Sequence, residues 1–255
     1  SWNAIYELFS FVIITFPIML IMLSNDLNFD KDKFDNSPDL NKMQINGIFD
    51  RSKKFLLNIV SPVGQYKYII FVLLFLILYR LPDNFISMMI NPFLLHIGYD
   101  EFEISTVGKL LGVTSAIAGG LLASYIMKKK TIYDSLLMFG ALHAAAHVLF
   151  IVQEFYGHNI YLLVVVTGFE SISGGMAMAA YIAFIASLCR GKFRATQYSF
   201  FSSMMGLSRS IFPALSGYIV ASFGWSMFYL FTTIATVPSL IMVLYLEKAR
   251  KREGE

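Results

Sequence analysis

Five ionisable residues lie inside stretches of this sequence that are otherwise apolar enough to span a membrane: Arg80, Asp83, Lys109, Glu170 and Arg209. A charged side chain at the centre of a bilayer costs about 2.5–3.5 kcal/mol on insertion scales, so such residues normally face a partner or a water-filled cavity. Their spread over several apolar stretches therefore predicts a shared polar pathway through a helix bundle, as in a membrane transporter.

The two carboxylates are the candidate proton carriers. A buried carboxylate that can be protonated is a usual device for coupling proton movement to transport. We therefore predict that Asp83 and Glu170 take part in proton coupling. For Asp83 the alternative is a structural ion pair with Arg80. For Glu170 the alternative is a structural ion pair with Lys109 or Arg209.

A polar stripe runs along the apolar stretch that carries Asp83. At 3.6 residues per turn, its polar side chains fall within about 100° of one another. The stripe consists of Arg80, Asp83, Asn84, Ser87 and Asn91. Such a stripe cannot face lipid without leaving hydrogen-bonding groups unpaired. We predict that it lines the pathway and that Asn84, Ser87 and Asn91 bind substrate.

The two cations on other stretches require anions. Arg209 keeps its charge at any accessible pH, and a bidentate contact with a substrate carboxylate would satisfy it. Pairing within the protein is the alternative. For Lys109 the anion would be Asp83, Glu170 or a substrate carboxylate. We predict that Lys109 and Arg209 bind substrate.

His143 and His147 are one helical turn apart, a spacing that can bind zinc. A metalloprotease would require His-Glu-x-x-His, whereas residues 144–146 are all alanine. Glu154 falls at a predicted membrane interface, so no third ligand is evident. We predict core or lipid-interface histidines, with no metal and no cofactor, and retain an intramembrane zinc enzyme only as an alternative. The sequence also lacks phosphate-loop and dinucleotide motifs, and we predict neither an enzyme nor a nucleic-acid partner.

The elements that position these residues are predicted to be transmembrane helices. Hydrophobic residues make up 56% of the sequence and charged residues 15%, against about 45–50% and about 25% in soluble domains. Seven apolar runs have the length needed to cross about 30 Å of hydrocarbon. They fall near 4–23, 68–92, 103–127, 132–153, 160–188, 195–221 and 226–246. The sequence predicts an all-α polytopic membrane protein.

The positions of the basic residues predict the orientation. Apart from Arg80, Lys109 and Arg209, every Lys and Arg lies in 24–67, 128–130, 190–194 or 248–252. The alternate connections contain none. Because cytoplasmic loops retain Lys and Arg, these four segments are predicted to be cytoplasmic, and so is the C-terminus.

This orientation predicts a domain order. Residues 1–23 would be the last transmembrane helix of a first half, and 24–66 a cytoplasmic linker. Residues 67–247 would form a six-helix bundle and 248–255 a basic cytoplasmic tail. Because the sequence starts with Ser1 and has one helix before the linker, we expect the first half to come from the rest of a longer chain or from a separate polypeptide.

One predicted packing face consists of small residues. At every fourth position of 103–127 the sequence has Gly108, Gly112, Ala116, Gly120 and Ser124. Small residues at this spacing let two helix backbones approach closely. We predict that this ridge packs against a neighbouring helix.

Several short runs over about 68–247 resemble the AmpG-type muropeptide permeases, in order and at matching spacing. They are YRLPDN (79–84), GYD (98–100), VGKLLG (107–112), GFESISGGM (168–176), FRATQY (193–198), GLSR (206–209), ALSG (214–217) and FGW (223–225). The sequence departs from the usual pattern at Arg80 and Pro82, where that family has a lysine and a glycine.

The resemblance implies the C-terminal half of a major facilitator-type transporter of the bacterial inner membrane. It implies proton-driven import of anhydro-muropeptides, which are fragments of peptidoglycan turnover, from periplasm to cytoplasm. The intramembrane charged residues of the family fall on Asp83, Lys109, Glu170 and Arg209. A wider kinship with acetyl-CoA transporters leaves a different anionic substrate as an alternative. A non-transporting remnant, or a membrane-embedded interaction partner, is a further alternative.

Overall fold

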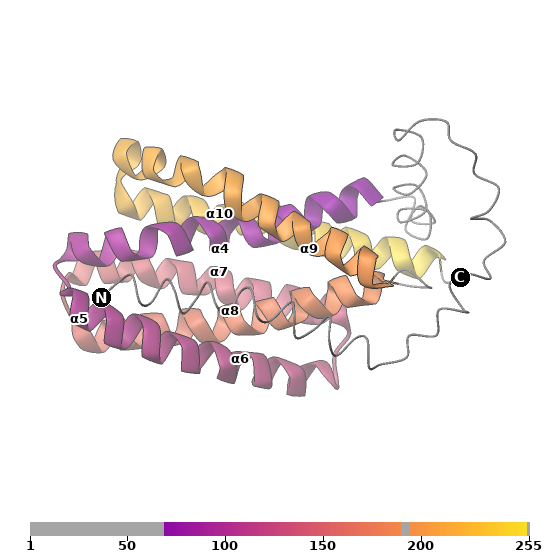
Figure 1. Ribbon diagram of the computed structural model, residues 1–255, viewed down its shortest axis with the longest axis horizontal. Coiled ribbons are helices and arrows are strands. Elements are labelled where there is room, and N and C mark those ends of the chain that lie inside the picture. Colours follow the sequence, from indigo (N-terminus) through magenta and orange to yellow (C-terminus); the bar gives the residue numbers. More distant parts are fainter. Residues whose placement is uncertain (1–68, 190–193, 254–255) are drawn as a thin grey trace, which may run out of the picture. The chain divides into compact units, whose positions relative to one another are not determined.

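The computed structural model describes residues 69–189 and 194–253, and this part of the chain is nearly all helical (Figure 1). The predicted first span, 1–23, and the predicted linker, 24–66, lie outside the described residues. The helices are α4 (Ile69–Ile97), α5 (Glu101–Glu103), the π-helical segment η1 (Ile104–Leu111), α6 (Gly112–Met127), α7 (Ile132–Tyr156), α8 (Ile160–Leu188), α9 (Arg194–Ile211), the 3₁₀ segment η2 (Phe212–Leu215) and α10 (Ser216–Glu253). The prediction of an all-α polytopic membrane protein is confirmed for this part of the chain.

Five helical runs in the described segments are long and apolar enough to cross a membrane. The sequence predicts six spans there. The two predicted spans 195–221 and 226–246 form one continuous helical run, Arg194–Ala249, in the structure. Inside α10, Gly224 leaves the helical conformation with φ 81°, a region that glycine adopts without the steric cost of a side chain. The predicted connection at 222–225 is therefore a sharp glycine kink between two helical segments.

The helices pack side by side as an α-helical bundle (Figure 1). Helix α8 packs against α6 and α7, and α10 packs against α7 and α4, while α9 lies against α4. Helix α4 continues through Pro82 and Pro92. Both prolines are accommodated inside the helix, as membrane proteins allow when neighbouring groups satisfy the freed backbone.

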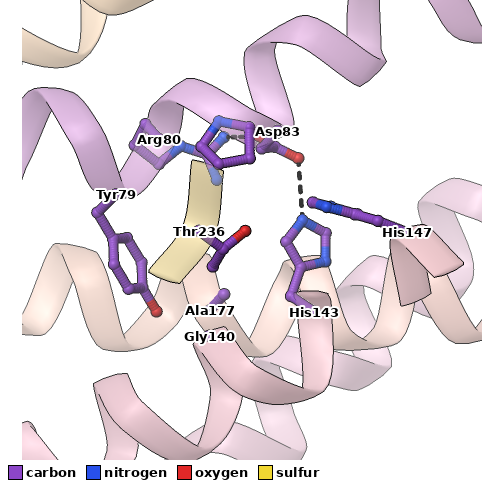
Figure 2. A pocket seen from close by; sticks show the side chains of 9 residues that line it. Tyr79, Arg80, Asp83, Gly140, His143, His147, Ala177 and Thr236 are labelled. Carbon is purple, nitrogen blue, oxygen red and sulfur yellow. Dashed lines mark hydrogen bonds and ion pairs between the residues drawn. The ribbon is translucent and has the colours of Figure 1, made fainter. Parts of the chain in front are cut away.

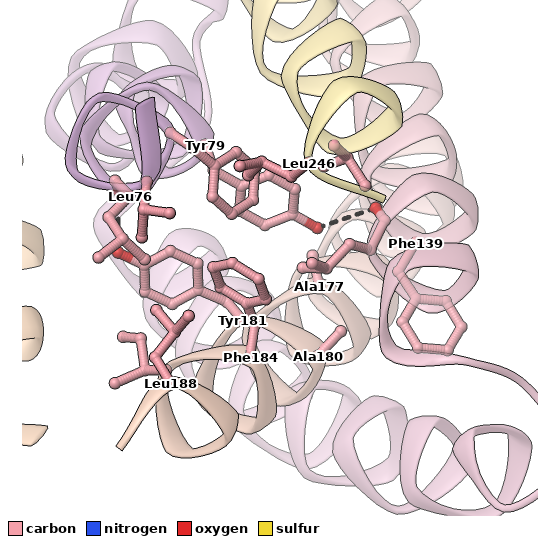
Figure 3. Close-up of a cluster of buried hydrophobic side chains, with 14 of the residues drawn as sticks. Leu76, Tyr79, Phe139, Ala177, Ala180, Tyr181, Phe184, Leu188 and Leu246 are labelled. Atoms are coloured by element: carbon pink, nitrogen blue, oxygen red, sulfur yellow. Dashed lines mark hydrogen bonds between the residues drawn. The ribbon is translucent and has the colours of Figure 1, made fainter. Parts of the chain in front are cut away.

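Two clusters of buried apolar side chains hold the bundle together. The first contains Tyr79, Phe139 and Tyr181, and the rings of Tyr79 and Tyr181 stack at 5.7 Å (Figure 3). The second contains Phe93 and Phe150, whose rings meet edge to face at 6.0 Å. On α4, α7 and α8 the first cluster lies toward one end of each helix and the second toward the other end. Midway along each of these three helices, between the two apolar clusters, polar and ionisable side chains can be accommodated.

The predicted small-residue ridge of 103–127 is only partly correct. A Cβ atom added at Gly119 would collide with the backbone carbonyl of Ile172 on α8, and one added at Gly175 would collide with that of Ala116. In contrast, a Cβ atom at Gly120 would meet nothing within 4 Å. At 3.6 residues per turn a strict four-residue spacing drifts around the helix, so the contact face passes from Ala116 to Gly119 and not to Gly120.

Candidate functional site

The middle of α4 carries an ion pair between Arg80 and Asp83, which are one turn apart. Both side chains are largely buried, with exposed fractions of 15% and 16%. The pair lies on α4 between Tyr79 of the first apolar cluster and Phe85 of the second. An ion pair at this depth lowers the cost of placing either charge within the bundle.

His143 from α7 joins this ion pair (Figure 2). Its Nε2 lies 3.3 Å from Asp83 Oδ1, and its Nδ1 lies 3.1 Å from Ser173 Oγ on α8. The imidazole is buried, with 7% of the residue exposed. A Cβ atom at Gly174 would lie 3.1 Å from His143 Cε1, so glycine leaves the space that the ring occupies. One side chain thus connects α4, α7 and α8.

Glu170 from α8 completes the cluster. Its carboxylate accepts a hydrogen bond from Ser171 Oγ at 3.1 Å. One ligand atom each from Glu170, Asp83 and His143 all lie within 4.8 Å of one another. No hydrogen bond or ion pair joins Glu170 to Asp83 or His143 in the described part of the chain, and a separation within 4.8 Å is short enough for one bridging water. We call Arg80, Asp83, His143 and Glu170 the central cluster.

The two other predicted cations are not part of the central cluster. Lys109 on η1 and Arg209 on α9 are exposed, and neither forms an ion pair with any residue of 69–189 or 194–253. Pairing of Glu170 with Lys109 or Arg209, the alternative considered from the sequence, therefore does not occur among these residues. Both cations remain available to an anion.

The predicted polar stripe of α4 is divided by its packing against α9. Asn84 is buried and donates from Nδ2 to Ser208 Oγ at 3.0 Å, so its amide is already bonded within the protein. Ser87 is exposed and donates to the backbone carbonyl of Asp83 at 2.8 Å. Asn91 is exposed. The half of the stripe nearest Asp83 therefore faces protein, while Ser87 and Asn91 lie at the surface of the bundle.

His147 lies one turn beyond His143 and contacts its ring edge to face, with centroids 4.7 Å apart. Only 1% of the residue is exposed, and neither ring nitrogen has a hydrogen-bond partner in the part of the chain that the structure describes. A small cavity of about 10 Å³ lies among His147, His143, Asp83 and Arg80, with room for about one water molecule. Burial of both histidines agrees with the prediction of core histidines, although the contacts of His143 are not those of an inert core residue.

A metal ion would find three ligands in Asp83, His143 and Glu170. The sequence did not reveal this set because its members come from three helices. However, Asp83 already neutralises Arg80, whose fixed positive charge opposes a second cation beside it. The charge of Arg80 therefore disfavours a metal ion at these three residues.

A second polar cluster, which the sequence did not predict, ties the end of α4 to the connection between α7 and α8. The buried Tyr99 hydroxyl donates to the carbonyl of Asn159 at 2.7 Å and accepts from Gln153 Nε2 at 2.6 Å and from the Asn159 N–H at 2.8 Å. Nearby, His158 contacts the Glu103 carboxylate at 2.9 Å. Burial raises the pKa of the Tyr99 hydroxyl, partly offset by its hydrogen bond with Asn159. It therefore stays protonated and keeps donating at neutral pH.

Membrane-length helices around a buried cluster of charges define a polytopic α-helical membrane protein with an ionisable centre, the arrangement typical of secondary transporters. Comparison with known proteins identifies the group. Residues 72–255 match the Major Facilitator Superfamily, and the chain belongs to this family.

The relatives agree with this membership. The chain is 56% identical over 244 residues to the "Putative transporter AmpG 1" of Rickettsia bellii, covering 96% of this chain and 58% of that protein. It is 50% identical over 250 residues to the protein of the same name from Rickettsia conorii, again covering 96% of this chain and 58% of the relative. It is 33% identical over 174 residues to the "Anhydromuropeptide permease" of Escherichia coli K12, covering 68% of this chain and 35% of the permease.

These names confirm the resemblance to AmpG-type permeases that was noted in the sequence. They also agree with the prediction that the protein is a transporter and not an enzyme. The chain spans about three fifths of the length of the two Rickettsia relatives.

Proposed function

We propose that this chain forms the second half of a proton-coupled carrier that imports anhydro-muropeptides from the periplasm to the cytoplasm. The observation that carries the proposal is the central cluster, which lies midway along three membrane-length helices. Family membership and the name of the Escherichia coli relative support the substrate class.

In this proposal the central cluster exchanges the coupling proton. Asp83 and Glu170 are the carboxylates of the cluster, and Glu170 is the one without an ion pair among the described residues. Charged groups inside a bundle bind and release protons most readily where a change of conformation alters their access to water. Alternating access would supply that change.

Lys109 and Arg209 would bind the carboxylates of the peptide part of the substrate. Both are exposed and lack an anion within the described segments, which is the state expected of groups that await a ligand. Ser87 and Asn91 offer exposed polar groups on α4 for the sugar or peptide. Asn84 would have to exchange its hydrogen bond with Ser208 in order to reach substrate.

The proposed setting is the bacterial inner membrane, with the basic loops and the C-terminus in the cytoplasm. A major facilitator cavity forms between two six-helix halves. The first half, which would end in a helix at 1–23 and be joined through the linker 24–66, would come from the rest of a longer chain or from a separate polypeptide. Substrate and protons would be the other partners.

Uptake of labelled anhydro-muropeptide into membrane vesicles of controlled orientation tests the proposal. The chain is assayed alone and together with a first-half polypeptide, under an imposed pH gradient. We expect uptake that requires the partner and collapses with the gradient.

A correctly inserted chain that shows no uptake in either case would overturn the proposed function. Accumulation of a different anionic compound, such as acetyl-CoA, would redirect the substrate assignment. Inactivity toward both would favour a non-transporting remnant or a membrane-embedded interaction partner.

A further inference from the structure

We infer that His143 is the proton-binding residue of the central cluster and that, as an imidazolium, it links α4, α7 and α8. The protonation state is argued from hydrogen-bond donors and acceptors. Its consequence for transport rests on the proposed function.

The first step concerns Ser173, the partner of His143 on α8. A serine hydroxyl has a single proton to donate. Ser173 Oγ donates that proton to the backbone carbonyl of Glu170 at 2.9 Å. With the hydroxyl hydrogen assigned to that contact, the same oxygen accepts at its 3.1 Å contact with His143, which places a hydrogen on His143 Nδ1.

The second step concerns Asp83, the partner on α4. An ionised carboxylate can only accept hydrogen bonds, and the ion pair with Arg80 favours the ionised form of Asp83. The nitrogen that faces Asp83 Oδ1 at 3.3 Å is His143 Nε2, and it must also carry a hydrogen. With hydrogens on both ring nitrogens, His143 is an imidazolium.

The groups around His143 can accommodate a positive ring. The titratable or charged groups that face it, from its own helix and from those packed against it, are Tyr79, Arg80, Asp83, His147 and Glu170, while α10 offers Thr236, which does not titrate. The imidazolium and Arg80 both contact the Asp83 carboxylate, and the Glu170 carboxyl group lies within 4.8 Å of His143 and Asp83. A buried cation is tolerated when it contacts an anion in this way.

Loss of the proton would have a structural effect. A neutral imidazole has one donor and one acceptor nitrogen, so His143 could keep a hydrogen bond to Asp83 or to Ser173 but not to both in their present directions. Deprotonation therefore releases α7 from α4 or from α8. Asp83, which the sequence predicts as a proton carrier, would instead keep a constant charge and act as the anchor of the imidazolium.

The test is nitrogen NMR on the full chain, labelled with ¹⁵N-histidine and reconstituted in lipid bilayers. The chain has four histidines, and the spectrum of His143→Gln identifies the signals of His143. At neutral pH we expect protons on both ring nitrogens of His143. A signal from a neutral imidazole, with one protonated nitrogen, would overturn the inference.

Variants of the two acceptors sharpen the test. Asp83→Asn and Ser173→Ala each remove one acceptor, and each is expected to reduce the imidazolium fraction of His143 at a given pH. Ser173→Ala is the milder change and serves if Asp83→Asn does not fold. His158→Gln, at an exposed histidine in a different cluster, is the matched control and should leave the His143 signal unchanged. An imidazolium fraction unaffected by either acceptor variant would contradict the argument.

A transport measurement separates this inference from the proposed function. With the first-half partner, His143→Gln should lose accumulation driven by a pH gradient while retaining exchange of labelled for unlabelled substrate at equal pH. Wild-type protein without any uptake would refute the proposed function and leave the NMR result to decide the protonation state. Gradient-driven accumulation by His143→Gln at the wild-type level would refute the role of His143 in coupling.

Discussion

Neutralising Asp83 should lower both the stability of the protein and its gradient-driven uptake of substrate. The carboxylate forms an ion pair with Arg80 and accepts from His143, and its side chain is only 16% exposed. Removing one partner of a buried charge pair costs about 3–5 kcal/mol, because the other charge is left uncompensated. Asparagine keeps the shape of the side chain and one oxygen that accepts hydrogen bonds. We therefore expect Asp83→Asn to lower the free energy of unfolding by about 3 kcal/mol, at the low end of this range.

Removing both charges of the ion pair tests whether the stability lost in Asp83→Asn comes from the unpaired charge of Arg80. Replacing a whole buried ion pair by apolar residues of similar volume is often neutral or stabilising. The double variant Arg80→Met, Asp83→Leu should therefore recover most of the stability that Asp83→Asn loses. It should not recover gradient-driven uptake, since the anchor for His143 is gone.

Stability is measured by denaturant unfolding of the purified chain in one detergent, with the wild type, both variants and Arg80→Met compared in parallel. Uptake is measured in vesicles with protein levels in the membrane matched. A double variant as unstable as Asp83→Asn would refute the uncompensated-charge argument. Normal accumulation by Asp83→Asn would refute a role for Asp83 in coupling.

Three further experiments, with four substitutions in all, have clear expected outcomes. Tyr99→Phe removes three hydrogen bonds in a buried cluster and should lower the unfolding free energy by about 1–3 kcal/mol, measured as above. Gly119→Val should destabilise the contact of α6 with α8, whereas Gly120→Val should not, because only the first position lacks room for a Cβ atom; equal thermal stabilities would contradict the observed packing face. Glu170→Gln should abolish gradient-driven uptake while the protein stays in the membrane, and unchanged accumulation would exclude Glu170 from coupling.

Much of the fold follows from the sequence because hydropathy reports directly on membrane-length helices. Helix α8 covers Ile160–Leu188, the same residues as its predicted span. The glycine kink at Gly224 falls within the predicted connection 222–225. Charge within an apolar run is also easy to recognise, so Asp83 and Glu170 were identified from the sequence. The structure brings these two carboxylates together but leaves Lys109 and Arg209 outside the cluster, and the shared pathway stays a prediction.

The remaining features depend on how the helices rotate against one another, which hydropathy and residue spacing do not reveal. His143 has an apolar neighbourhood in sequence, and only the packing of α7 against α4 and α8 brings it to Asp83 and Ser173. The contact face of α6 passes through Gly119 and not Gly120 for the same reason. The hydrogen bond between Asn84 and Ser208 joins residues that are 124 positions apart, so the sequence pattern does not reveal it, and substrate binding by Asn84 stays a prediction.

The position of the central cluster between two apolar clusters constrains how a proton can reach it. Toward one end of α4, α7 and α8 the path is filled by the stacked rings of Tyr79 and Tyr181, and toward the other end by Phe93 and Phe150. Closely packed aromatic rings leave little room for water along the bundle axis. Asp83 nevertheless keeps a small exposed fraction, so the cluster reaches the side of the bundle. In a two-half carrier that side would line the cavity between the halves, where access alternates between the two faces of the membrane. The proton would therefore enter from the same cavity as the substrate, so that one change of conformation would control the access of both.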